Sequence, residues 1–407
     1  MRRLISCLIL CAVTGPLFAA APLHKFPGAV PGRYIITLDA DHPSADHADF
    51  LTRSAGVTLV HTYETVLNGF SVRATEQKAQ ALTKMPGVEA VWEVPPARGT
   101  DIDYTAPKGL DRIDQRDLPL DNQYAYFMYT TPTRIYIVDT GVDPRTEFGS
   151  RLIVNQNYWT NSSGVRDPND YTDGGLPLND SWHGTPHAVI SAGADNGISR
   201  FAKLVNVRVM KNAGDGSWDD IVAGVQFVTQ QRNALPSEKH IANFSIGANW
   251  GNPFTGYQPA ITAFAASINA GVAWIFSAGN DAIDGCKQFP AWMAYQYSGA
   301  MSVGASNPST DAIFSYSNQG PCVDIYAPSS VEWGDTQNGS VATGTSAAAP
   351  HVTGVFANRW ANAPTSSAGE IEGLIKGVGT PGKLTSIWAN SNNLLLYSLL
   401  PRRRPSG

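Results

Sequence analysis

The chain contains little cysteine and little charge. Only 4 of its 407 residues are cysteine, and charged residues make up 15%. The formal net charge of −5 provides no basic surface, so we predict no nucleic-acid partner. No stretch stays apolar over the roughly 20 residues that a membrane-spanning helix needs, so we predict no membrane partner. The 43% of hydrophobic residues and the 38 glycines favour a large, well-buried globular protein over a disordered one.

The first residues have the pattern of an export signal. Arg2 and Arg3 give a positive start, residues 4–18 form an apolar run, and residues 19–21 are three alanines that offer a small-residue cleavage site. The run is too short to span a bilayer comfortably, which disfavours the alternative of a membrane anchor. We therefore predict a signal peptide over residues 1–21 and a secreted protein.

Export decides how the cysteines are interpreted. Cys7 and Cys11 would leave with the signal peptide, so Cys286 and Cys322 would remain. Two cysteines in an exported chain favour a disulfide over the alternative of two unpaired buried thiols. They have no C-x-x-C spacing, so they do not form a metal-binding pattern.

Residues 32–94 are patterned as a small separate unit. Thr75 is a helix cap, and the helix that follows is stopped by Pro86 and Gly87. The polar residues 95–106 are typical of an exposed linker, where proteolytic nicking occurs. The expected element order is βαββαβ, a compact α+β fold, with strands at 33–38, 57–63, 69–73 and 88–94 and helices at about 44–54 and 75–85.

The rest of the chain alternates apolar strands with helical stretches. The strands are continuous apolar runs, as expected of strands that are covered on both faces. This alternation predicts an α/β fold, a mostly parallel sheet with helices on both faces. The expected strands are 134–138, 204–210, 240–246, 272–277, 301–305 and 323–327, and the expected helices are 217–232, 260–270 and 346–360.

Three segments carry residues suited to nucleophilic catalysis. Asp139 ends a buried strand, His183 stands where a loop enters a helix, and Ser346 begins a helix among very small residues. Taken alone, Asp139 would be a turn former, His183 a helix cap or a surface histidine, and Ser346 an ordinary helix cap. Taken together, they supply a serine nucleophile, a base for its proton, and a carboxylate that fixes the tautomer of that base.

The order Asp, His, Ser and the motif around Ser346 resemble the subtilase family of subtilisin-like serine peptidases. The likeness is greatest to the aqualysin-like members of its proteinase K branch. The resemblance implies a secreted, monomeric endopeptidase that cleaves protein substrates and is inhibited by its own propeptide. It implies a propeptide at residues 22–100, a peptidase domain at 101–407, and self-cleavage near Thr100.

The resemblance also assigns roles around the reacting serine. The segment 274–280 is similar to the family's A-A-G-N motif, which makes Asn280 the side-chain donor to the oxyanion. Extended substrate would pair with two stretches of backbone. The primary pocket is expected to be apolar because none of its wall residues is charged, which implies broad specificity with an apolar or aromatic preference. The implied substrate-binding residues are Gly214, Gly216, Trp218, Ser245, Ile246, Gly247, Ser277, Ala278 and Gly279.

The match departs from the family pattern around the histidine. Where the family has H-G-T-H-V-A-G, this chain has H-G-T-P-H-A-V, so Pro186 replaces the second histidine and Val189 replaces a glycine. His187 is therefore not the second histidine of the pattern. The loop 143–180 is longer than in proteinase K, and the sequence assigns it no role.

Oxygen-bearing residues predict calcium. Their flexible spacing after residue 110 suits calcium rather than zinc. The stretch resembles the N-terminal calcium site of aqualysin-like enzymes, and Asp324 resembles a second family site completed by carbonyls near Ser298 and Ala300. The alternative is a set of solvated carboxylates. The predicted first-site ligands are Asp111, Asp114, Gln115, Asp121 and Gln123.

Three other functions compete with this interpretation. A catalytically silent binding protein on the same fold would be favoured by loss of Asp139, His183, Asn280 or Ser346, and all four are present. An α/β-hydrolase esterase is disfavoured because the motif around Ser346 lacks the second glycine of G-x-S-x-G and the chain order differs. A sedolisin uses a glutamate where His183 stands.

Overall fold

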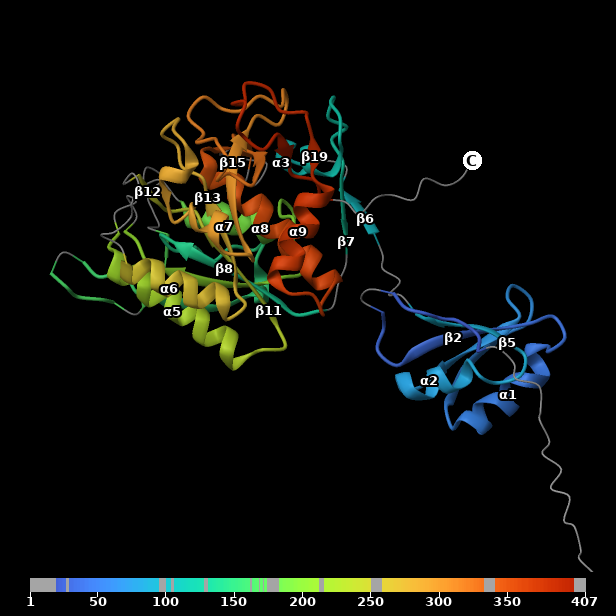
Figure 1. Cartoon of the computed structure of the whole chain (residues 1–407). Coiled ribbons are helices and arrows are strands. Elements are labelled where there is room, and N and C mark those ends of the chain that lie inside the picture. The colour runs from blue at the N-terminus through green and yellow to red at the C-terminus, as the bar shows by residue number, and fades with distance from the viewer. Residues whose placement is uncertain are drawn as a thin grey trace, which may run out of the picture. The chain divides into compact units, whose positions relative to one another are not determined.

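The structure is a computed structural model in which the chain forms two compact units, residues 1–97 and 98–407 (Figure 1). Most of the predicted signal peptide lies outside the described residues. No helix among the described residues is long and apolar enough to cross a membrane. The structure describes residues 20–26, 29–94, 100–103, 106–127, 131–161, 163–167, 169–170, 172–173, 183–211, 216–249, 258–332 and 341–398.

The N-terminal unit is a five-stranded sheet in the order β1-β5-β2-β4-β3, with α1 and α2 against it (Figure 1). Buried and half-buried residues alternate along β2, as expected of a strand with one covered face. Thr75 caps α2 by accepting the Lys78 N–H at 3.4 Å. The predicted βαββαβ order is present, and the short β1 was not predicted. The elements are β1 Leu23–His24, β2 Arg33–Leu38, α1 Ser44–Ala55, β3 Thr58–Tyr63, β4 Gly69–Arg73, α2 Glu76–Leu82 and β5 Val88–Glu93.

The C-terminal unit is built on a nine-stranded sheet in the order β19-β20-β16-β15-β13-β11-β8-β10-β9. Its pairings are parallel except that of β19 with β20. The predicted parallel α/β architecture is therefore confirmed. The strands are β8 Thr133–Asp139, β9 Leu152–Asn157, β10 Lys203–Arg208, β11 Lys239–Phe244, β13 Ala273–Ser277, β15 Ala300–Ser306, β16 Ile325–Pro328, β19 Thr380–Pro381 and β20 Leu394–Leu395.

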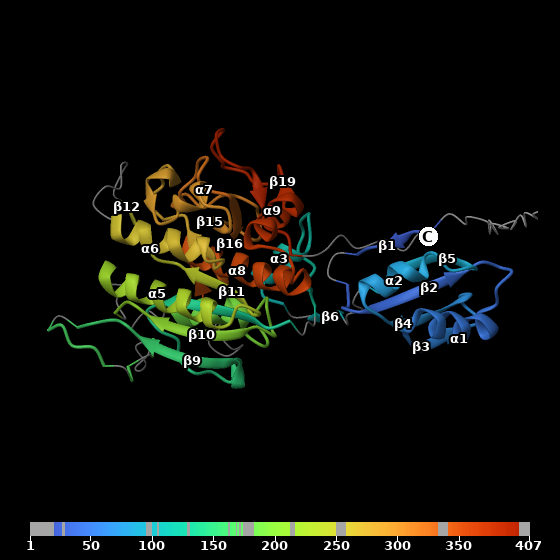
Figure 2. The same ribbon diagram turned by 60° about the horizontal axis from the view of Figure 1, so that its bottom comes forward.

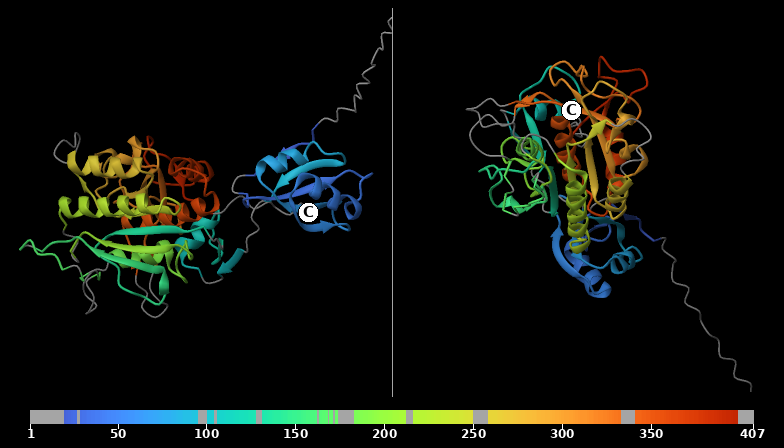
Figure 3. Two further views of the ribbon diagram at one scale, coloured as in Figure 1. Left: turned by 90° about the horizontal axis from the view of Figure 1, so that it is seen from below. Right: turned by 90° about the vertical axis from the view of Figure 1, so that its left-hand side faces the viewer.

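Helices cover both faces of this sheet because its strands are apolar on both sides. Ile135 and Ile137 of β8 pack with α4 and α8, whereas Tyr136 and Val138 pack with α5 and α6. Figures 2 and 3 show α5 (green) and α6 (yellow) side by side. The helices are α4 Gly184–Ala192, α5 Trp218–Ala234, α6 Gln258–Asn269, α7 Met293–Gln296, α8 Thr345–Asn362 and α9 Ala368–Val378.

Two of the differences from the sequence-based expectation have a clear structural cause. The predicted linker contains a strand, because β6 (Thr100–Asp103) pairs antiparallel with β7 (Tyr124–Phe127). The strand predicted to end at residue 246 stops at Phe244, because Ser245 leaves the sheet and its hydroxyl donates to the Ser346 carbonyl oxygen at 3.0 Å. Both differences depend on partners far along the chain.

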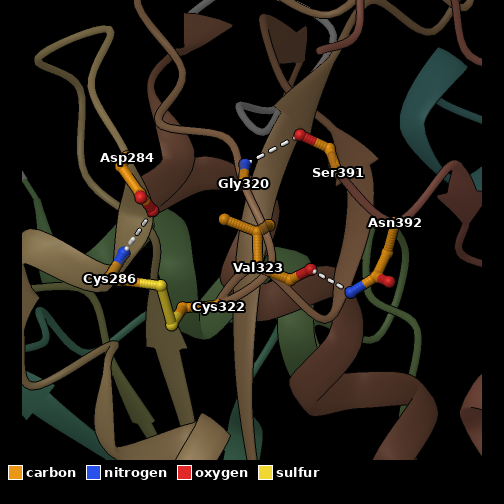
Figure 4. Close-up of a disulfide and its surroundings, with 7 residues drawn as sticks. All are labelled: Asp284, Cys286, Gly320, Cys322, Val323, Ser391 and Asn392. Carbon is orange, nitrogen blue, oxygen red and sulfur yellow. Dashed lines mark hydrogen bonds between the residues drawn. A yellow bond between two sulfur atoms is a disulfide. The ribbon is translucent and has the colours of Figure 1, made fainter. Parts of the chain in front are cut away.

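A disulfide joins Cys286 and Cys322, whose sequence separation is 36 (Figure 4). Asp284 accepts the Cys286 N–H at 2.9 Å, and on the other side of the bridge Asn392 donates to the Val323 carbonyl oxygen at 2.8 Å. The bridge therefore ties the segment that follows β13 to the segment that precedes β16.

Candidate active site

Asp139 and His183 form the centre of the site. Asp139 is the last residue of β8 and is fully buried, and His183 immediately precedes α4. The His183 Nδ1 lies 2.7 Å from Asp139 Oδ1, which also accepts the Thr140 N–H at 2.7 Å. The His183 side chain is 37% exposed, so the ring is anchored to a buried carboxylate while part of it remains accessible.

The two groups shift each other's pKa. Burial alone would raise the pKa of Asp139, but His183 and His187 outweigh it and hold the pKa below its usual value. Burial alone would lower the pKa of His183, but the Asp139 carboxylate outweighs it and the pKa is raised. The carboxylate thus stays charged and stabilises the imidazolium that forms when His183 takes a proton.

A second histidine contacts the same carboxylate. His187, one turn into α4, is buried, and its Nδ1 lies 3.2 Å from Asp139 Oδ2. Burial and the nearby His183 lower the pKa of His187, so the ring is neutral near pH 7. A carboxylate can only accept, so the neutral ring carries its proton on Nδ1 and donates it to Asp139. The sequence indicated only that His187 is not the second histidine of the family pattern, because which strand a helical residue faces depends on packing between distant segments.

The long loop contributes a second buried carboxylate, Asp173. It accepts the N–H groups of His183 at 3.3 Å and Thr185 at 2.7 Å, and also the Thr140 hydroxyl. It therefore links the end of β8 to the start of α4, the two segments that carry Asp139 and His183. Burial raises the pKa of Asp173 to about 6, with Asp139 adding to the rise. No sequence pattern in this Asn-, Asp- and Gly-rich loop predicts the contact.

Ser346 lies in the first turn of α8 and is buried except for a small part. Its hydroxyl donates to the Thr343 carbonyl oxygen at 3.2 Å, and among the described residues it has no hydrogen bond to His183. Such bonds are often long in proteins without substrate. Pro350 has no N–H to donate back to the Ser346 carbonyl oxygen, and Ser245 supplies the missing donor.

Asn280 is oriented by the residue that precedes Ser346. Its Oδ1 accepts the Thr345 N–H at 2.8 Å and the Thr345 hydroxyl at 3.0 Å. Asn280 is exposed, and its Nδ2 therefore remains available as a hydrogen-bond donor. A side chain on Gly344 would lie 3.0 Å from Ser346 Oγ and 3.2 Å from Asn280 Nδ2. Ser346 Oγ and Asn280 Nδ2 therefore both lie close to Gly344 and leave little room for a side chain there. The φ of +90° at Gly344 also favours glycine.

The two expected walls of the primary pocket lie at the ends of two neighbouring parallel strands, β11 and β13. Residues 245–247 follow β11, and residues 277–279 begin at the last residue of β13, so both segments lie at the same edge of the sheet. Trp218 begins α5 and lies 5.0 Å from Phe289 between ring centroids. Gly216 forms a bridge with Met210, whereas Gly214 lies outside the described residues.

The first predicted calcium site contains two carboxylates that lie close to each other, those of Asp111 and Asp121. Asp111 is fully buried, and burial together with the nearby Asp121 raises its pKa. Among the described residues, neither carboxylate forms an ion pair, so a bound cation would relieve their repulsion. Asp114 accepts the Ala125 N–H at 2.8 Å, Gln115 donates to the Pro119 carbonyl oxygen at 2.8 Å, and Gln123 lies in the same loop.

The second predicted calcium ligand already has a positive partner. Asp324 accepts the Lys376 ammonium at 2.9 Å on one oxygen and the Ser302 N–H at 2.9 Å on the other. Lys376 also bonds Glu372 at 3.1 Å. An ammonium at this position balances the charge that calcium would balance, so the residues present do not fit a second calcium ion.

Among the described residues, Asp139, His183 and His187 form the only group of three or more His, Cys, Asp or Glu side chains close enough together to hold a metal ion. Their ligand atoms lie within 4.8 Å of one another. Both histidine Nδ1 atoms already lie at hydrogen-bonding distance from the carboxylate. The cluster therefore has the geometry of a hydrogen-bonded Asp-His pair with a second histidine, rather than that of a metal centre.

Comparison with known proteins extends over both units. Residues 131–379 match the subtilase family and residues 33–93 match peptidase inhibitor I9. The chain is 31% identical over 398 residues to an extracellular serine proteinase of Thermus sp. strain Rt41A, covering 91% of this chain and 90% of that one. It is 33% identical over 353 residues to alkaline serine exoprotease A of Vibrio alginolyticus, covering 84% of this chain but only 61% of the relative's length.

A solved structure has a fold similar to that of this chain. A cold-adapted subtilisin-like serine proteinase superimposes with a TM-score of 0.61 at 31% identity, covering 73% of this chain and 99% of that chain. The matches in sequence and in fold, together with the Asp139–His183 pair observed in this chain, lead to one conclusion. The chain belongs to the subtilase family and is a subtilisin-like serine protease with an inhibitor I9 domain.

Proposed function

We propose that this protein is a secreted serine endopeptidase in which Ser346 is the nucleophile, His183 the general base and Asp139 the residue that orients it. The observation that carries the proposal is the 2.7 Å contact between His183 Nδ1 and the buried Asp139 carboxylate. It leaves the other ring nitrogen, Nε2, to accept a proton. A catalytically silent binding protein does not need a histidine that is held by a buried carboxylate and positioned to accept a proton.

The proposed reaction is an acyl transfer to Ser346 followed by hydrolysis. His183 Nε2 takes the hydroxyl proton as Ser346 Oγ attacks the peptide carbonyl carbon, and Asp139 stabilises the imidazolium. The Asn280 amide donates a hydrogen bond to the oxyanion. His183 then protonates the leaving amine as the C–N bond breaks, and water repeats the steps to release the acyl group from Ser346. The first turn of α8 adds positive potential at the attacked carbonyl.

Secretion and precursor processing belong to the same proposal. The N-terminal pattern of residues 1–21 is that of an export signal, and the Thermus relative is named an extracellular proteinase. Residues 22–100 would be a propeptide that the peptidase domain, 101–407, cuts from itself. The inhibitor I9 match supports its role as an intramolecular inhibitor.

Digestion of unfolded casein tests this function. The mature protein is expected to cut at internal positions throughout the chain, and His183→Ala is expected to produce no peptides above background, because the hydroxyl proton then has no acceptor. Peptide mapping by mass spectrometry records both results. Cleavage that only shortens the chain from its ends would contradict an endopeptidase, and no cleavage by the wild type would favour the silent binding protein.

We also propose that calcium binds at the first site, held by Asp111, Asp114, Gln115, Asp121 and Gln123. The ion would balance the buried Asp111 carboxylate and tie α3 (Lys108–Asp114) to the loop that follows. Its contribution would be to stability, because a ligand that binds only the folded state stabilises that state by mass action.

Removal of calcium is therefore expected to lower the melting temperature of the wild type by roughly 5–10 °C, measured with and without a chelator. Asp121→Asn should lose most of this response, since it removes an exposed carboxylate of the site. Asp324→Asn is the matched control and should keep the response, because Lys376 occupies that position. A wild-type melting temperature that is the same with and without chelator would refute the site.

A further inference from the structure

Gln288 lies beside the proposed primary pocket, where no sequence pattern predicts a role for it. It begins β14 (Gln288–Phe289), which pairs antiparallel with β12 (Ala248–Asn249) directly after the wall segment 245–247. Only 5% of Gln288 is exposed. The pairing brings its side chain to the carboxyl edge of the sheet, where β11 and β13 end.

Two glycines locate the carboxamide of Gln288. A Cβ added to Gly247 would lie 2.5 Å from Gln288 Nε2, and a Cβ added to Gly279 would lie 2.8 Å from Gln288 Oε1. One glycine belongs to each proposed wall, so the carboxamide lies between the walls and contacts both. A side chain at Gly247 would collide with this carboxamide and with the Phe289 carbonyl oxygen, and a side chain at Gly279 would collide with it and with Asn318 Nδ2, which would lie at 2.3 Å.

The carboxamide is not fully bonded. Gln288 Oε1 is buried and accepts no hydrogen bond from any described residue. A buried acceptor without a donor costs free energy. A ligand that brings a donor removes this cost, whereas an apolar ligand does not, so the first binds more tightly. The oxygen and nitrogen of the carboxamide exchange places when the group turns over, and a partner carboxamide can match either orientation because it both donates and accepts.

We propose that Gln288 is a specificity-determining residue of the primary pocket and selects substrates whose P1 residue, on the amino side of the cleaved bond, ends in a carboxamide or another hydrogen-bond donor. This inference rests on the proposed function. The proposed preference for a carboxamide at P1 replaces the earlier expectation of an apolar or aromatic preference, because that expectation was based only on the uncharged wall residues. The carboxamide also shortens the space between the walls, which disfavours large aromatic side chains.

The test uses peptide p-nitroanilides that differ only at P1, where glutamine and methionine have similar length but only glutamine has donors. The wild type is expected to favour glutamine by about tenfold or more in kcat/KM. Gln288→Leu keeps the volume but removes the carboxamide, so it should reverse the preference towards methionine. Gln288→Ala shortens the side chain and should raise kcat/KM for P1 phenylalanine by at least about tenfold.

Gln226→Ala, on the exposed side of α5, is the matched control and should leave all ratios unchanged. The melting temperature of Gln288→Leu should not fall, because a buried unpartnered amide is replaced by an apolar side chain. A wild type that favours methionine, or a Gln288→Leu variant that keeps the wild-type ratio, overturns the inference while leaving the endopeptidase intact. Absence of cleavage of every peptide by the wild type overturns the proposed function, and this inference with it.

Discussion

Ser346→Ala is expected to accumulate as the full precursor with only the signal peptide removed, whereas the wild type is expected to acquire a new N-terminus near Asp101. A peptidase that carries its own linker holds that bond at high effective concentration, so the first cut can be intramolecular. Loss of the nucleophile abolishes that cut, since in the related enzyme subtilisin it lowers kcat on the order of 10⁶-fold. Intact mass and N-terminal sequencing of the two separately expressed proteins measure the difference.

Ser309→Ala is the matched control, because Ser309 is exposed and lies outside the site. It should be processed like the wild type. Addition of a trace of mature wild-type enzyme to Ser346→Ala should produce the same cut in trans, which shows that the linker of the variant remains cleavable. If Ser346→Ala without added protease showed the wild-type N-terminus, self-cleavage would be wrong and another enzyme would perform the processing.

Asn280→Ala is expected to lower kcat by about 10²–10³-fold with little change in KM, because the amide donates mainly when charge develops on the oxyanion. Removing such a donor costs about 3–4 kcal/mol of transition-state stabilisation. Steady-state kinetics on the mature enzyme with one peptide substrate measure both constants.

Two further variants separate donation from support of the helix. Asn280→Asp keeps an oxygen for the Thr345 N–H and hydroxyl but supplies no donor, so it should be impaired at least as much as the alanine variant. Asn233→Ala, exposed near the end of α5, should leave kcat unchanged. A kcat for Asn280→Ala within tenfold of the wild type would remove Asn280 from the oxyanion site.

Much of this protein could be predicted because the information is local. The apolar runs predicted β8, β11 and β13 as strands buried on both faces, and the structure confirms them. The order of Asp139, His183 and Ser346, each at the end of a strand or the start of a helix, predicted the family that the comparisons show. Strand periodicity, helix caps and chain order all depend on residues near one another in sequence.

What only the tertiary structure decided is which distant side chains meet. Lys376 reaches Asp324 across a separation of 52 residues, so these residues do not fit the second calcium site that the family resemblance implied. His187 and Asp173 join the Asp139–His183 pair through the packing of α4 and of a loop that has no local pattern. Gln288 enters the proposed pocket because β14 pairs with β12. A sequence determines the chemistry that each side chain can offer, but contacts between segments far apart in the chain form only when the packed sheet brings those segments together.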